Sequence, residues 1–257
     1  NMRKYLLHVL IISFVFLLTP IVPVASYVGV IETYKEEIRI NPDDAKAHYK
    51  LGLAYRKSGK YQEAIESIKH AIRINPDDVL AHYNLGVTYD KSGMYEEAIE
   101  SYKQAIRINP DYAEAHVNLG AAYFKSGMHK EAIESLKQAI RINPDFAIAH
   151  YNLGYTYNSL GMHKEAIESY KQVIRIDPDG ALAHTNLGVV YAESGTDIAE
   201  VHYNLGLAYG KSGMHKEAIE SFKQAIKINP DYADAHYSLD VAYSKSGMNY
   251  IKSGMQK

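Results

Sequence analysis

The sequence predicts an all-helical solenoid in which antiparallel helix pairs stack one after another, and three observations carry this prediction. Prolines recur every 34 residues along most of the chain, at positions 42, 76, 110, 144 and 178. Glycines repeat with the same step, at positions 59, 93, 127, 161 and 195. Between these residues the apolar side chains follow the three- and four-residue spacing of a helix. A fixed period of this length is typical of stacked helical units.

Residues 113–146 form one unit, and its first half has the pattern of an amphipathic helix. Apolar or small residues recur on one helical face, at Ala115, Leu119, Ala122 and Tyr123. Asp111 precedes this run and Glu114 follows three residues later, which predicts an N-terminal capping box. Gly127 comes after the run and predicts a left-handed helix end.

The second half of the unit has the same helical period and ends at Pro144, because proline cannot continue a helix. Its apolar residues are Ala132, Ile133, Leu136, Ala139 and Ile140. Gly120 lies inside the first helix, where a glycine costs about 1 kcal/mol relative to alanine. Its recurrence in the other units predicts that the two helices of a pair approach closely at this residue.

The same unit divides most of the chain, with one irregularity. The predicted parts are a second helix alone over 27–44, four full units over 45–180, a first helix alone over 181–198, a full unit over 199–232, a capping first helix over 233–247 and a tail over 248–257. The half-unit should break the array near 195–199. Two interpretations remain open: helix 181–194 caps a first array and 199–247 begins a second, or the next helix takes the missing position with a local kink.

Residues 1–26 differ from the repeats and have the layout of a secretory signal peptide. Two basic residues precede an apolar run over residues 6–18, and two prolines follow it. This run is shorter than the roughly 20 residues that a membrane-spanning helix needs. We expect either a cleaved leader, with export to the periplasm or the exterior, or an inner-membrane anchor formed by residues 5–25.

Composition excludes several classes of function. The formal charge of the 257-residue chain is −2, so no basic excess supports binding to nucleic acid. Cysteine is absent, which excludes disulfides, thiolate metal sites and cysteine nucleophiles. No catalytic motif is present. We therefore expect no enzyme activity, no metal and no cofactor.

Histidine needs separate treatment because one repeat position carries it in every unit. The residues are His48, His82, His116, His150, His184, His202 and His236. Neighbouring units should place them about 10 Å apart, given the distances between packed helices. That is too far to share one metal ion. We expect an amphipathic side chain half-buried between units.

Counted from Ala113, the unit has Leu at position 7, Gly at 8, Tyr at 11, Ala at 20 and 27, and Pro at 32. This pattern resembles the tetratricopeptide repeat, over residues 31 to about 247. The resemblance implies a right-handed superhelix whose first helices line a concave groove, chiefly through positions 2, 5, 6, 9, 12 and 13. The chain departs from the family at position 4, where His replaces the frequent Trp.

These groove positions supply the candidate binding residues. Position 6 carries an asparagine in five units, at Asn84, Asn118, Asn152, Asn186 and Asn204. The amide can both donate to and accept from a peptide backbone, and the series is similar to the asparagine ladder of the repeat region of O-GlcNAc transferases. An alternative is that these amides only bond neighbouring turns. The other candidates are Tyr83, Tyr151, Tyr203, Lys91, Lys125, Phe124 and Tyr155, with Arg56 and Asn158 as further selectivity positions.

The predicted function is protein–protein interaction, in which the groove holds an extended peptide or a partner helix. A groove of Tyr, Asn and Lys would favour an extended, acidic segment. Position 5 is never basic, so the carboxylate clamp of chaperone-binding family members is not expected. Two alternatives remain: a self-assembling scaffold or homo-oligomer, as in magnetosome-associated members, and a non-catalytic subunit of an enzyme supplied by another chain.

Overall fold

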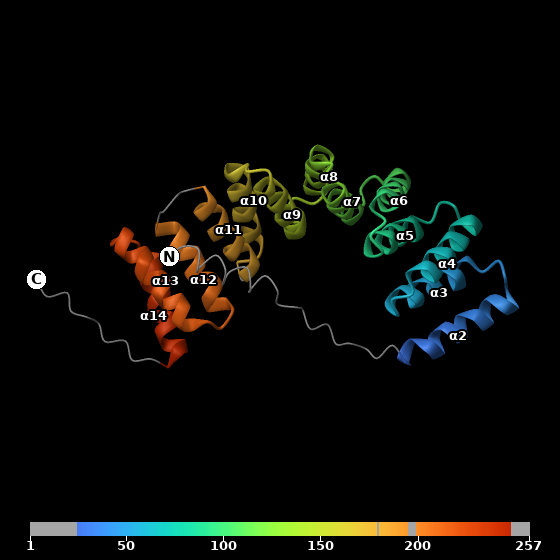
Figure 1. Ribbon diagram of the computed structural model, residues 1–257, viewed down its shortest axis with the longest axis horizontal. Helices are drawn as coiled ribbons and strands as arrows, with labels where there is room; N and C mark the ends of the chain where they lie inside the picture. The colour runs from blue at the N-terminus through green and yellow to red at the C-terminus, as the bar shows by residue number, and fades with distance from the viewer. Residues whose placement is uncertain (1–24, 179, 195–198, 248–257) are drawn as a thin grey trace, which may run out of the picture. The chain divides into compact units, whose positions relative to one another are not determined.

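The computed structural model describes residues 25–178, 180–194 and 199–247, and all regular structure within these ranges is α-helical (Figure 1). The thirteen helices described are α2 (Ala25–Ile40), α3 (Ala45–Lys57), α4 (Tyr61–Ile74), α5 (Val79–Lys91), α6 (Tyr95–Ile108), α7 (Ala113–Lys125), α8 (His129–Ile142), α9 (Ala147–Ser159), α10 (His163–Ile176), α11 (Ala181–Glu193), α12 (Ala199–Lys211), α13 (His215–Ile228) and α14 (Ala233–Ser246). Consecutive helices pack in pairs. The predicted α-solenoid of helix pairs is confirmed.

The described residues fall into two compact units, 25–152 and 153–247, which divide within α9. The predicted leader or anchor, the turn at 195–198 and the tail beyond 247 lie outside the described residues. No helix in the described part of the chain combines the length and hydropathy that crossing a membrane requires.

Glycines inside the first helices permit close packing of each helix pair, as predicted. A Cβ atom on Gly86 would lie 2.6 Å from the ring of Tyr102, and one on Gly52 would lie 2.5 Å from Ile68. Both distances are far below ordinary van der Waals contact, so only glycine fits. Gly127 has a φ of +76°, which confirms the left-handed helix end that the sequence predicted.

The helix starts correct one prediction. The side chains of Asp44 and Asp78 accept hydrogen bonds from backbone N–H groups of α3 and α5, at 3.0 Å in both cases. At α7 the equivalent capping position is Tyr112, which makes no side-chain cap bond, so Asp111 is not the N-cap. Helices α3, α5 and α7 each begin three residues after the preceding proline, whichever residue occupies the capping position. The Asn109 side chain accepts from the Asp111 N–H at 3.2 Å and shapes the preceding turn.

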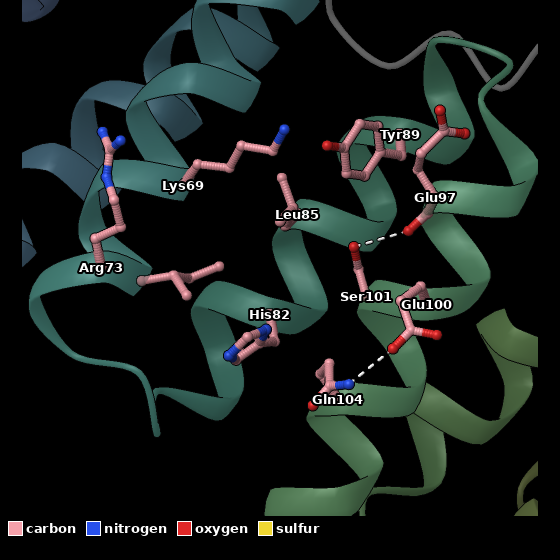
Figure 2. Close-up of a pocket in the computed structure, with 10 residues that line it drawn as sticks. Lys69, Arg73, His82, Leu85, Tyr89, Glu97, Glu100, Ser101 and Gln104 are labelled. Carbon is pink, nitrogen blue, oxygen red and sulfur yellow. Dashed lines mark hydrogen bonds between the residues drawn. The ribbon is translucent and has the colours of Figure 1, made fainter.

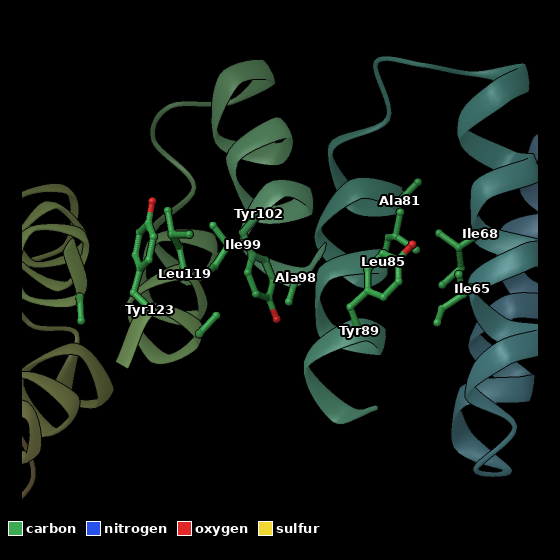
Figure 3. Close-up of a cluster of buried hydrophobic side chains, with 12 residues drawn as sticks. Ile65, Ile68, Ala81, Leu85, Tyr89, Ala98, Ile99, Tyr102, Leu119 and Tyr123 are labelled. Atoms are coloured by element: carbon green, nitrogen blue, oxygen red, sulfur yellow. The ribbon is translucent and has the colours of Figure 1, made fainter. Parts of the chain in front are cut away.

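The core of residues 25–152 alternates alanines with larger side chains along successive helices. Ala81, Ala98 and Ala132 are completely buried, and Tyr102 and Ile68 fill the space between them. Figure 3 shows the labelled side chains of this core, from Ile68 on α4 to Leu119 and Tyr123 on α7, lying in a row. Each helix pair therefore contributes one layer to a core that continues from pair to pair.

The half-unit at α11 is closed by the helix that follows it. In regular pairs the glycine of the first helix faces a residue 16 positions later, whereas a Cβ atom on Gly188 would lie 2.9 Å from Leu205 of α12. Lys171 of α10 also pairs with Glu200 of α12 at 3.1 Å. Helix α12 additionally forms a regular pair with α13, where Gly206 faces Phe222. Helix α12 therefore docks on α11 as well as on α13, and all three helices belong to the compact unit 153–247.

Candidate protein-binding face

Successive first helices contact one another within each compact unit: α3 with α5 and α5 with α7 in residues 25–152, and α12 with α14 in residues 153–247. These contacts are more extensive than any between successive second helices. In Figure 1, α6 and α8 lie along one edge and α5 and α7 along the other. The first helices α5 and α7 therefore lie on one side of residues 25–152 and the second helices α6 and α8 on the other. We call the surface that the first helices present in residues 25–152 the inner face; its side chains are Tyr49, Arg56, Leu80, Tyr83, Asn84, Asp90, Lys91, Asn118, Phe124 and Lys125.

Tyrosine and asparagine side chains on the inner face bond each helix pair to the next. Asn84 Nδ2 donates to Tyr49 Oη at 2.8 Å, and Asn118 Nδ2 donates to Tyr83 Oη at 2.9 Å. Both bonds join residues 35 positions apart. The sequence predicted both asparagines and Tyr83 as candidate binding residues, but it did not predict that tyrosines and asparagines pair. The signal was present, because a tyrosine at position 5 precedes an asparagine at position 6 of the next unit.

The two asparagines differ in what they leave for a ligand. The Asn84 amide donates to Leu80 O as well as to Tyr49, and its Oδ1 accepts from Arg56 Nη1 at 2.9 Å. The Asn118 amide faces Tyr83 and Tyr102, and its Oδ1 accepts no hydrogen bond from any described residue. The predicted alternatives therefore apply to different residues: Asn84 is an internal connector, and Asn118 keeps an open acceptor.

The tyrosine hydroxyls of the inner face remain protonated at neutral pH. Burial raises the pKa of Tyr49. Burial also raises the pKa of Tyr83, and the hydrogen bond from the Asn118 amide partly offsets that rise. Each hydroxyl oxygen accepts from an asparagine, so each hydroxyl proton remains available to a further acceptor.

The remaining predicted residues of the inner face lie near the C-terminal ends of α5 and α7. Lys125 Nζ lies 2.7 Å from both carboxylate oxygens of Asp90 and over the ring of Tyr95. This ion pair is partly exposed, so its contribution to stability is small. Lys91 is exposed, and the Phe124 ring lies 5.3 Å from that of His129. Lys91, Lys125 and Phe124 thus lie at the C-terminal ends of the helices that also carry Asn84 and Asn118.

Helix α9 carries three of the predicted residues. Tyr151 and Asn152, which belong to residues 25–152, are half-buried, and Tyr155, which belongs to 153–247, is 52% exposed. Asn186 is half-buried in α11.

Asn204 does not belong to an exposed face, which corrects its prediction as a binding residue. It is only 6% exposed, its Nδ2 donates to Glu200 O at 2.8 Å, and its Oδ1 lies 3.2 Å from His184 Nδ1. Tyr203 next to it is half-buried, with its ring 5.0 Å from that of Tyr232. The cause is the half-unit. Because α12 packs directly on α11, the side chain at position 6 of α12 lies in the contact between these two helices.

Histidine at position 4 connects each first helix to the loop before it. Nε2 lies 2.8–3.1 Å from the proline carbonyl six residues earlier, for His48, His82, His116, His150, His184 and His236. A carbonyl oxygen only accepts, so Nε2 carries the proton in each case. No described residues gather into a cluster of three or more metal-binding side chains.

A cavity of about 460 Å³ lies between α4, α5 and α6 (Figure 2). Leu85 and Tyr89 form part of its wall, with Lys69 Nζ 5.6 Å from the centre of the Tyr89 ring. Glu97 and Glu100 lie on α6 across the cavity from Lys69 and Arg73 of α4. The cavity opens between two second helices, so it lies away from the inner face.

The fold and these repeats define a family of repeat proteins. Models of the TPR repeat match residues 52–93, 90–127, 122–161 and 154–195, and tetratricopeptide repeat models match 33–66 and 199–232. The chain belongs to the tetratricopeptide repeat family, whose members are protein-interaction scaffolds.

Solved structures show the same fold. MamA is 31% identical, with a TM-score of 0.55, and the match covers 71% of this chain and 96% of MamA. YrrB, described as a TPR protein with an unusual peptide-binding site, is 23% identical, with a TM-score of 0.55 over 82% of this chain and 99% of YrrB. The APC/C hetero-tetramer Cut9–Hcn1 contains a chain that is 18% identical, with a TM-score of 0.56 over 84% of this chain and 46% of that one. No curated protein matches the sequence.

Proposed function

We propose that the inner face binds an extended segment of another protein. The observation that carries this proposal is the exposure of large apolar side chains at position 2 of the first helices: Leu80 is 52% exposed and Ile148 is 48% exposed. Exposed apolar side chains that recur on one surface are typical of interaction sites. Leu80 lies on α5 together with Tyr83, and the neighbouring first helices α3 and α7 carry Tyr49 and Asn118. Together these groups offer apolar contact and backbone hydrogen bonds to an extended chain.

The role of the asparagines follows from this arrangement. Asn118 Oδ1 is the acceptor that a peptide N–H would use, as in the similar ladder of O-GlcNAc transferases. Asn84 acts through Tyr49, whose hydroxyl it positions. Replacing Asn118 by Ala should therefore weaken binding of a partner, whereas the fold should lose only one hydrogen bond.

Site-specific photocrosslinking tests the proposal in the full-length protein. A photoreactive amino acid at position 80 should capture a discrete partner in the cells that make the protein. The same amino acid at position 107, an exposed site of α6 on the outer side, serves as the matched control. Equal labelling patterns at the two positions, or no adduct at position 80, would refute the proposed face.

Self-assembly is a second candidate, because α2 leaves apolar side chains exposed. Val28 is 59% exposed and Val30 is 41% exposed, on a helix that pairs with α3 on its other side. Light scattering over a range of protein concentrations decides between the two. A size that grows with concentration, and is restored to one species by replacing both valines with serine, would favour assembly.

We also propose that residues 1–26 direct the protein to the cell envelope, because their charge and apolar pattern match a leader or an anchor. Mass spectrometry of the mature N-terminus distinguishes the two: a new terminus near residue 27 indicates a cleaved leader. An intact terminus in the membrane fraction indicates an anchor, and an intact terminus in the cytosolic fraction would contradict both.

A further inference from the structure

Arg56 is a half-buried cation on the inner face that has no counter-ion among the residues the structure describes. Its Nη1 donates to Asn84 Oδ1 at 2.9 Å and lies 3.5 Å from the Asn84 carbonyl oxygen. No ion pair of the described residues includes it. A guanidinium carries five N–H donors, so most of them lack a protein acceptor. Burying a charge without a partner costs free energy, which the rest of the fold must offset.

The groups around Arg56 are hydrogen-bond donors rather than acids. Burial lowers the pKa of Arg56, and the groups that act on it electrostatically are the tyrosines Tyr49, Tyr102, Tyr83 and Tyr61. Tyr49 and Tyr83 each accept from an asparagine, so their hydroxyl protons are available. The groups that act on Arg56 are therefore tyrosine hydroxyls, two of which keep a proton to donate, and no carboxylate is among them.

The repeat geometry shows what is missing at this position. Position 12 of one unit meets position 13 of the next: Asp90 pairs with Lys125 at 2.7 Å, and Asn158 donates to Glu193 at 3.0 Å. At the same 35-residue step the sequence has Arg56 and Lys91, two basic residues, where the other two steps have complementary residues. A basic residue in the last turn of a helix is stabilised by the helix dipole, which accounts for Lys91. Arg56 also lies in the last turn of α3, but its side chain turns to Asn84 of the next first helix.

We propose that Arg56, Lys91 and the hydroxyls of Tyr49 and Tyr83 form a site for an anionic oxo group on a side chain of the bound segment. A carboxylate and a phosphoryl group share this chemistry, since both accept paired hydrogen bonds from a guanidinium. The inference rests on the proposed function, because the anion belongs to a peptide whose neighbouring residues contact Leu80 and Asn118. It goes further by naming one residue class that the partner must carry.

Defined peptide pools test this site in the full-length protein. The probes are short fluorescein-labelled peptides with randomised flanks and a fixed central residue, which is Glu, Gln, phosphoserine or Ser. Fluorescence polarisation should give an apparent Kd about tenfold or more lower for the Glu pool than for the Gln pool, or for the phosphoserine pool than for the Ser pool, because a charge-assisted bond is lost in each comparison. Which of the two comparisons shows the larger ratio distinguishes the carboxylate from the phosphoryl group.

The matched variants are Arg56→Gln and Arg107→Gln, the second of which is exposed on the outer side of α6. Arg56→Gln should abolish the preference for the charged pools and leave the affinity for the neutral pools unchanged. Arg107→Gln should change neither. If neutral and charged pools bind equally to the unmodified protein, the anion site is refuted but the peptide-binding function stands. If no pool binds, both are refuted.

Lys91→Glu provides a second test that does not depend on removing Arg56. The new carboxylate would occupy the site from within, as Asp90 does for Lys125 in the next step. The charged pools should then lose their preference, and the melting temperature should stay the same or rise. A preference that survives in a folded Lys91→Glu protein would contradict the proposal.

Discussion

At the scale of single residues, the inner face is built from polar side chains that contact the next helix pair rather than their own. Tyr83 illustrates this, because its hydroxyl accepts from Asn118 of the following first helix. The bond is half-buried and neutral, so its net contribution to stability should be that of an ordinary hydrogen bond.

Replacing Tyr83 by Phe should therefore lower the free energy of unfolding by about 1 kcal/mol, because it leaves the Asn118 amide without this acceptor. Urea unfolding followed by circular dichroism measures the change. Tyr237→Phe is the matched control, since Tyr237 is 73% exposed. A loss of equal size in the control would show that the Tyr83 hydroxyl has no special role.

Buried tyrosines should also make the protein sensitive to alkali. Burial raises the pKa of Tyr112, with a smaller contribution from Tyr83, to about 12, from an ordinary value of 10.0. Between these two values the folded state holds a proton that the unfolded state has lost, so stability is fully present below pH 10 and falls as the pH rises towards 12. Urea unfolding over this range should show a shallower decline for Tyr112→Phe. An unchanged slope in the variant would contradict this assignment.

At the scale of helices, the glycine of each first helix is required by its partner helix. Gly86→Ala gains about 1 kcal/mol of helix propensity. It loses more, because the new methyl group would lie 2.6 Å from the buried Tyr102 ring, and overpacking of this kind costs about 1–3 kcal/mol.

We therefore expect Gly86→Ala to lower the melting temperature. Gly29→Ala in α2 is the control with the opposite sign, because a Cβ atom there meets nothing within 4 Å. It should raise the melting temperature through helix propensity alone. A melting temperature that rises in Gly86→Ala as it does in Gly29→Ala would show that the close approach at Gly86 has no energetic effect.

Helices and close approaches were predictable because each depends on spacing within one unit. The apolar period predicted both helices of residues 113–146, and Gly120, whose Cβ atom would lie 2.7 Å from Leu136, was correctly assigned to close packing. Contacts between units were harder. The tyrosine–asparagine pairing depends on how two first helices lie side by side. The burial of Asn204 follows from α12 packing on α11, which the pattern of a regular unit does not contain.

At the scale of the whole molecule, a solenoid unfolds by local steps, because each helix pair contacts only its neighbours. The destabilising Gly86→Ala variant should therefore speed amide hydrogen exchange in α4 to α7 and leave α13 unchanged. Mass-spectrometric hydrogen exchange at low denaturant measures this by peptide. Uniformly faster exchange in all helices would indicate that the whole chain unfolds as one cooperative unit.

The spacing of the tyrosine–asparagine bonds also constrains how such a chain can lengthen. Copying one whole unit supplies a fresh tyrosine for the following asparagine and a fresh asparagine for the preceding tyrosine, so every partner is replaced. Adding half a unit breaks this matching. At the half-unit the tyrosine position is occupied by Thr185, and it is His184, one residue earlier, that meets Asn204. Gene duplication can thus extend the array freely in whole steps, whereas each fractional step demands a compensating substitution beside it.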